Sequence, residues 1–139
     1  MTDLERFVTA QGAGGTYFRA VAELRAGDKR SHWMWFVFPQ LAGLGMSAMS
    51  QRYAIGSLAE AREYLDHPVL GPRLAECCGI LLDLENVTAT DVLGGIDAVK
   101  LRSCATLFHR AAPDRPEFTG ILEKYFDGEP DPATDQLLR

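Results

Sequence analysis

The stretch from Lys29 to Gln40 places the strongest constraint on how this chain can fold. It reads Lys-Arg-Ser-His-Trp-Met-Trp-Phe-Val-Phe-Pro-Gln and contains both tryptophans of the sequence. Aromatic side chains bury about 150–250 Å² each and dominate the energetics of a protein core. Because so many large apolar side chains in a row are costly to leave in water, the rest of the chain must fold over them.

The aromatic run has two possible secondary structures. Its shortness and aromatic content favour a strand. However, no second convincing strand occurs in the sequence, and an unpaired strand would leave buried backbone groups without partners. We therefore expect a short buried helix with Ser31 as its N-cap, ending at Phe38 because Pro39 disfavours the helical conformation for the residue before it.

Signals for further helices recur as helical periodicity, capping residues, and glycine or proline stops. Thr2 with Glu5 and Ser57 with Glu60 form capping boxes, and Asp97 is expected to cap a helix over residues 98–109. Other helices are expected over residues 16–26, 68–81, 88–93, 116–126 and 131–138. The sequence predicts the all-α class: a single compact domain, residues 1–139, of about eight mostly short helices around the buried aromatic helix.

Two glycine-containing segments connect these helices. Residues 11–15 can be pictured as a loop that cradles phosphate at a helix N-terminus. Because no strand precedes the loop and no Lys-Ser or Lys-Thr follows it, we interpret it as a flexible turn. The second connection, residues 40–56, has no acidic residue, and we expect its larger apolar side chains to face the core: Leu41, Leu44, Met46 and Met49.

Composition and charge exclude several classes of protein. The net charge of −5 argues against non-specific binding to duplex nucleic acid, which needs many cationic contacts. No apolar run reaches the roughly 18–20 residues of a membrane span, and the first residues lack an apolar signal core. We therefore expect a cytoplasmic protein without a membrane partner; the oligomeric state stays open.

The three cysteines fit a reducing compartment better than a disulfide framework. Cys77, Cys104 and a histidine can be pictured as a metal site, but no paired spacing of the zinc type occurs. We interpret the cysteines as small core residues on packed helices, and we expect no metal and no cofactor.

The polar start of the aromatic run is a candidate ligand site. A helix beginning at Ser31 would present free amides and its dipole beside the side chains of Lys29, Arg30 and His32, an arrangement that favours an anion such as phosphate. The alternative is a solvated charge cluster before a buried helix. The tryptophans can stack on a base or on nicotinamide, although they are commonly core. The candidate residues for binding a small phosphorylated ligand are Lys29, Arg30, Ser31, His32, Trp33 and Gln40.

Lys100 and Asp97 are the candidate catalytic pair. At i and i+3 of one helix they can form an ordinary exposed ion pair. If Lys100 is instead desolvated, its neutral amine can attack an opened ribose aldehyde to form a Schiff base, with Asp97 or Asp91 moving protons.

The chain resembles a family known only as a domain of unknown function, DUF1810. The resemblance rests on the run from Lys29 to Gln40 and on short motifs through residue 108, so it covers nearly the whole chain. These motifs are Gly43-Leu44-Gly45, Ser50, Tyr53, Glu60-Ala61, Tyr64-Leu65, His67-Pro68, Leu70-Gly71, Gly94, Asp97, Lys100-Leu101, Ser103 and Thr106-Leu107-Phe108. The resemblance implies an all-α fold and brings no established activity. The label calpastatin, sometimes given to this family, does not suit a globular chain, because calpastatins are disordered repeats.

A looser resemblance links residues 64–95 to the NADAR (YbiA-like) superfamily of small helical proteins. It rests on Tyr64-Leu65, His67-Pro68 and Gly94-Gly95, whereas Leu93 stands where that superfamily has a tryptophan. It implies processing of ADP-ribose derivatives. Two hypotheses follow: a pocket that binds or acts on a nucleotide or ADP-ribose derivative, with N-glycosidic hydrolysis through a lysine Schiff base, or a non-catalytic interaction module whose aromatic run is only core.

Overall fold

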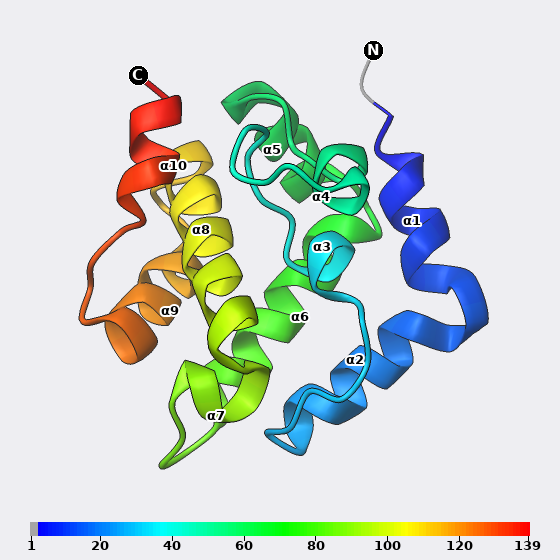
Figure 1. The fold of residues 1–139 in the computed structure, drawn as a ribbon, viewed down its shortest axis with the longest axis vertical. Helices are drawn as coiled ribbons and strands as arrows, with labels where there is room; N and C mark the ends of the chain where they lie inside the picture. Colours follow the sequence, from blue (N-terminus) through cyan, green and yellow to red (C-terminus); the bar gives the residue numbers. More distant parts are fainter. Residues whose placement is uncertain (1–2) are drawn as a thin grey trace.

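The computed structural model describes residues 3–139 and is all-α, which confirms the expected fold class (Figure 1). The helices are α1 (Glu5–Gly12), α2 (Thr16–Arg25), α3 (Met34–Val37), α4 (Ala48–Arg52), α5 (Leu58–Asp66), α6 (Leu70–Asp83), α7 (Ala89–Leu93), α8 (Gly95–Ala111), α9 (Pro116–Phe126) and α10 (Pro132–Leu137), with a 3-10 helix at Ala13–Gly15. Within residues 3–139, β-type pairing is confined to an isolated bridge between Leu41 and Ile55.

The long helices α6 and α8 form the centre of the fold. α8 packs against α5, α7, α9 and α10, and α6 packs against α2, α5 and α9. In Figure 1, α1 and α2 lie on one side of the molecule, α9 and α10 lie on the other, and the short helix α3 lies between them. None of the helices within residues 3–139 has both the length and the apolar composition that crossing a bilayer requires.

The aromatic run is helical and buried as expected, but its helix is shorter than predicted. Only Met34–Val37 is helical, and Trp33 occupies the N-cap position without a side-chain cap. Ser31 is therefore not the N-cap: its hydroxyl and its backbone N–H both donate to the carboxylate of Glu23 on α2. That competing acceptor holds residues 30 and 31 in an irregular loop. Phe38 ends the helix as predicted.

Several other boundaries agree with the sequence. Ser57 caps α5 by accepting from the Glu60 N–H, Thr88 and Asp91 form a capping box at α7, and Asp131 caps α10. The capping box expected at Thr2 lies outside the described residues.

Other expectations are wrong in detail. Gln11 belongs to α1, whereas the sequence predicted a turn beginning at this residue. Its side chain is buried because its Nε2 donates a hydrogen bond of 2.8 Å to the backbone carbonyl of Phe36. Asp97 lies in the first turn of α8 rather than at its cap, since Gly94, with φ of 85°, begins the helix earlier. Met46 and Met49 are exposed instead of facing the core, because residues 48–52 form the short surface helix α4.

Two helices approach closely at Gly71. A Cβ atom added there would overlap the backbone carbonyl of Leu65 in the preceding helix, α5. The tight connection between α5 and α6 therefore depends on glycine at this position.

Candidate functional site

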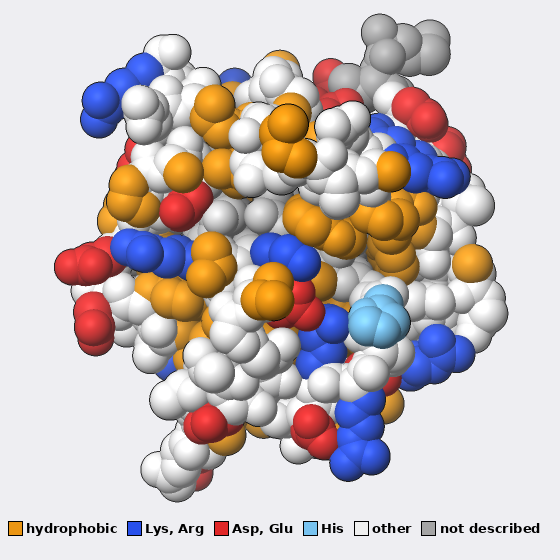
Figure 2. Space-filling model, viewed as in Figure 1, with side chains coloured by type: hydrophobic (Ala, Val, Ile, Leu, Met, Phe, Trp, Pro, Cys, Tyr) orange, Lys and Arg blue, Asp and Glu red, His pale blue; other side chains and the backbone are white. Residues whose placement is uncertain are grey.

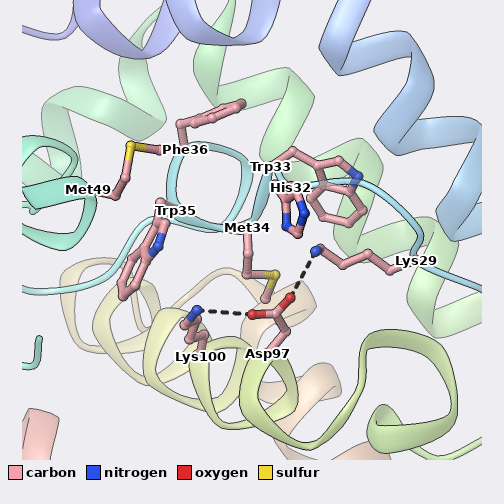
Figure 3. A pocket seen from close by; sticks show the side chains of 9 residues that line it. All are labelled: Lys29, His32, Trp33, Met34, Trp35, Phe36, Met49, Asp97 and Lys100. Carbon is pink, nitrogen blue, oxygen red and sulfur yellow. Dashed lines mark hydrogen bonds and ion pairs between the residues drawn. The ribbon is translucent and has the colours of Figure 1, made fainter. Parts of the chain in front are cut away.

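A pocket of about 90 Å³ lies between α3, the loop that precedes it, α4 and the start of α8. Figure 3 shows the nine side chains that line it: Lys29, His32, Trp33, Met34, Trp35, Phe36, Met49, Asp97 and Lys100. Figure 2 shows basic, acidic and histidine side chains gathered at a hollow near the centre of this face, next to hydrophobic surface. The pocket therefore combines a charged side with an aromatic one.

The fold brings five of the candidate residues into this single pocket: Lys29, His32, Trp33, Asp97 and Lys100. Lys29 and His32 come from the loop before α3, whereas Asp97 and Lys100 come from α8. Lys29 Nζ lies 2.8 Å from Asp97 Oδ2, and Lys100 Nζ lies 3.0 Å from Asp97 Oδ1. The two ammonium groups thus approach one carboxylate from two sides (Figure 3).

The three charged groups are largely shielded from solvent. The side chains of Lys29, Asp97 and Lys100 are 8%, 17% and 19% exposed, respectively. Burial raises the pKa of Asp97, but the hydrogen bonds and charges of Lys29 and Lys100 outweigh it, so the pKa is lowered overall. With two positive groups and one negative group, the cluster carries one net positive charge.

Each lysine of the cluster also contacts a tryptophan ring. Lys29 Nζ lies 5.0 Å from the ring centroid of Trp33, and Lys100 Nζ lies 4.1 Å from that of Trp35. Such cation–π contacts stabilise an ammonium group over an aromatic face. Trp33 is buried in the core, whereas Trp35 is partly exposed and forms a wall of the pocket. The two tryptophans therefore have different environments.

The loop before α3 is held by Glu23, a residue outside the predicted site. Its Oε1 accepts from the backbone N–H groups of Arg30 and Ser31 at 2.8 and 3.0 Å and from Trp33 Nε1 at 3.0 Å. Burial raises the pKa of Glu23, but these donors and the Ser31 hydroxyl lower it to about 2. The carboxylate of Glu23 thus occupies the place where the amides were expected to meet a phosphate.

The remaining candidate residues lie outside this pocket. Arg30 is exposed and pairs with Asp28 at 2.8 Å, and Ser31 bonds to Glu23. Gln40 is buried and lines a neighbouring recess. Asp91 serves in the capping box of α7 instead of approaching Lys100.

Some residues of the pocket could not be recognised from local sequence. Met49 reaches it from α4, and Phe36 differs in no local respect from its core neighbours in the run. The sequence offers one signal for Glu23, which lies near the end of an amphipathic helix shortly before a polar loop. That pattern does not identify the groups with which Glu23 forms hydrogen bonds.

The arrangement suits the binding of an anion more readily than the binding of a metal. Within residues 3–139, no group of three or more His, Cys, Asp or Glu side chains is placed to hold a metal ion. The free cysteines are buried in the core, as the sequence indicated. Together the ammonium groups of Lys29 and Lys100 carry six donors, which is more than the roughly four acceptor sites of the Asp97 carboxylate.

Comparisons with known proteins agree with this fold. The sequence model of a family described as "Protein of unknown function (DUF1810)" matches residues 1–138. The chain is also similar to the crystal structure of the conserved hypothetical protein Rv1873 from Mycobacterium tuberculosis, with 49% sequence identity and a TM-score of 0.94 over 98% of this chain and 96% of that one. A search of curated proteins finds no match.

Proposed function

Since the chain belongs to the DUF1810 family, whose description assigns no activity, we propose a function from the geometry of the pocket. The pocket binds the anionic group of a small ligand of the nucleotide or ADP-ribose class. The observation that carries this proposal is the shielded cluster in which Asp97 holds Lys29 and Lys100 side by side.

Electrostatics support an anionic ligand. The cluster is positive by one charge although the whole chain has a net charge of −5. Charges in a partly water-excluded site interact more strongly than charges in bulk water. Asp97 fixes both ammonium groups in place, so a phosphate meets donors that are already ordered.

The size and the aromatic side of the pocket bear on the ligand class. Pockets that enclose a drug-sized molecule usually measure about 300–1,000 Å³, and this one measures about 90 Å³. Only part of a nucleotide therefore fits inside, and the rest must lie along the adjoining surface. Trp35 offers a partly exposed aromatic face for such contact.

The geometry favours binding over the Schiff-base route. A lysine that is ion-paired with a carboxylate is an ammonium ion, whose nitrogen has no lone pair with which to attack an aldehyde. The alternative of a non-catalytic interaction module treats the aromatic run as core only. Trp35 and Phe36 line the pocket, which favours a ligand-binding role for part of that run.

Calorimetric titration with ribose 5-phosphate, AMP and ADP-ribose tests the proposal. We expect the wild-type protein to bind these ligands. The Lys100→Met and Lys29→Met variants should bind them about 10- to 100-fold more weakly, because each variant loses a hydrogen bond from a charged group. Arg30→Gln is the matched control, because Arg30 is an exposed cation of the same loop that pairs with Asp28 and does not line the pocket.

Neutral ribose serves as the ligand control, since it lacks the phosphate and should bind far more weakly. The proposal is contradicted if none of the three phosphorylated ligands binds, or if Lys29→Met and Lys100→Met bind them as tightly as Arg30→Gln does.

A further inference from the structure

A second recess of about 410 Å³ adjoins the candidate pocket. It lies between α8, the chain that follows α3, and the start of α10. Trp35 and Lys100 line both cavities, so the two share a boundary. A ligand that extends out of the smaller pocket past Lys100 enters this recess.

The recess contains a buried hydrogen-bond donor that has no partner. Gln40 is only 7% exposed and lines the recess. Nothing in the described part of the chain accepts a hydrogen bond from its Nε2 atom. Buried polar groups are nearly always paired, and an orphaned one calls for an explanation such as a missing ligand. Because Gln40 lines the recess, an acceptor atom on a molecule bound there would satisfy this donor once the amide group turns toward the recess.

A buried acceptor faces the same recess. Asp131 is 9% exposed, and its Oδ2 accepts from the hydroxyl groups of Ser103 at 3.0 Å and Thr134 at 2.6 Å. These bonds fix the orientation of the carboxylate, and both Asp131 and Ser103 line the recess. The polar lining therefore offers a donor, from Gln40, and an acceptor, from Asp131.

The other walls are apolar. Trp35, Leu44, Ile96 and Val99 contribute aromatic and aliphatic surface, and Ile96 and Val99 are 78% and 61% exposed. Large exposed apolar side chains beside a cavity are typical of a ligand-binding surface. A flat ring suits this lining. Its faces can pack against the apolar walls, while polar atoms along one edge pair with Gln40 and Asp131.

We propose that this recess binds the heterocyclic ring of the ligand whose anionic group occupies the first pocket. The ring carries an acceptor for Gln40 Nε2 and an N–H donor for Asp131, as adenine and nicotinamide do. This inference rests on the proposed function and narrows its ligand class to mononucleotides and their derivatives. Lys100 lies where the two parts of the ligand meet.

The experiment compares four probes by calorimetric titration: ribose 5-phosphate, adenosine, AMP and nicotinamide mononucleotide. We expect at least one mononucleotide to bind 10-fold or more tightly than ribose 5-phosphate, because only the mononucleotides carry both parts. This gain should disappear in Gln40→Met, which removes the donor at similar size, and in Val99→Glu, which places a charge at the mouth of the recess.

Met46→Glu is the matched control for Val99→Glu. Met46 is 89% exposed and lines neither cavity, so the same charge there should leave the gain intact. Because Val99 is itself an exposed residue, Val99→Glu keeps the test valid if Gln40→Met does not fold. The ring site is overturned if neither mononucleotide binds more tightly than ribose 5-phosphate, or if the gain survives in either folded variant.

The probes also separate the two proposals. Ribose 5-phosphate binding that depends on Lys29, without any gain from a ring, supports the anion pocket and overturns the ring site. Adenosine binding that depends on Gln40, with no binding of ribose 5-phosphate and with AMP bound no more tightly in the wild type than in Lys29→Met and Lys100→Met, overturns the anion pocket and supports a ring site on its own.

Discussion

The ammonium group of Lys29 lies 2.8 Å from Oδ2 of Asp97, although the two residues come from a loop and a helix that are far apart in the sequence. The pair joins the segment before α3 to the first turn of α8. It is shielded from solvent, so its removal affects stability more than the loss of a surface ion pair does.

Asp97→Asn should destabilise the fold by about 1.5–3 kcal/mol, because it leaves the ammonium group of Lys29 shielded and without its charged partner. Urea unfolding followed by circular dichroism measures this change. Asp28→Asn is the control: Asp28 pairs with Arg30 in an exposed ion pair, and its loss should have a much smaller effect on the free energy of unfolding. Equal effects of the two substitutions would show that the shielded pair of Lys29 and Asp97 stabilises the fold no more than an exposed ion pair does.

Glu23 should make the free energy of unfolding depend on pH in acid. Its pKa is about 2 in the folded protein against an ordinary value of 4.5, so its contribution is present above pH 4.5 and is lost as the pH falls toward 2. After allowance for solvent screening, we expect this loss to be about 1–2 kcal/mol.

Glu23→Gln should therefore flatten the stability profile between pH 4.5 and pH 2, as measured by urea unfolding at a series of pH values. Glu85→Gln, at an exposed position, should leave the profile as steep as in the wild type. A profile that keeps its slope in Glu23→Gln would show that the carboxylate does not hold the loop.

Gly71→Ala should destabilise the protein by about 1–3 kcal/mol, even though alanine is the better helix former, because its methyl group would overlap the Leu65 carbonyl. Gly79→Ala, in the same helix and with open space at the Cβ position, should stabilise it by about 0.5–1 kcal/mol. Thermal unfolding of the two variants measures both changes. The same sign for both would refute the close approach of α5 and α6.

The cysteines should be inert toward thiol reagents in the folded state. Burial raises the pKa of Cys77 to about 12 and raises those of Cys78 and Cys104 well above the ordinary value. Because the thiolate is the reactive form, a disulfide reagent at pH 8 should label no cysteine in the native protein and all three in guanidinium chloride. Fast labelling of the native protein would contradict this burial.

The fold was largely predictable because its signals are local. Ser57, Thr88 and Asp131 each lie next to the amides that they cap, so their roles can be read within a few residues. The pairing of Asp97 with Lys100 was also readable from their i, i+3 spacing. Each of these inferences needs only one turn of chain.

The candidate site was less predictable because its contacts are long-range. Lys29 and Asp97 line one pocket because the loop before α3 lies beside the start of α8, and their sequence positions do not reveal this. The role of Glu23 depends on a loop that folds back onto α2, and the burial of Gln40 depends on three separate segments. Helical periodicity carries no information about such long-range contacts between segments.

The anchoring of the loop before α3 has a consequence for the rate of binding. Glu23 holds the backbone of residues 30 and 31, and the N–H of Lys29 donates to the Val92 carbonyl at 2.8 Å. The loop thus loses its conformational entropy when the chain folds, not when a ligand arrives. Association should therefore follow a single exponential whose observed rate rises linearly with ligand concentration, without the plateau that a loop-closing step would impose.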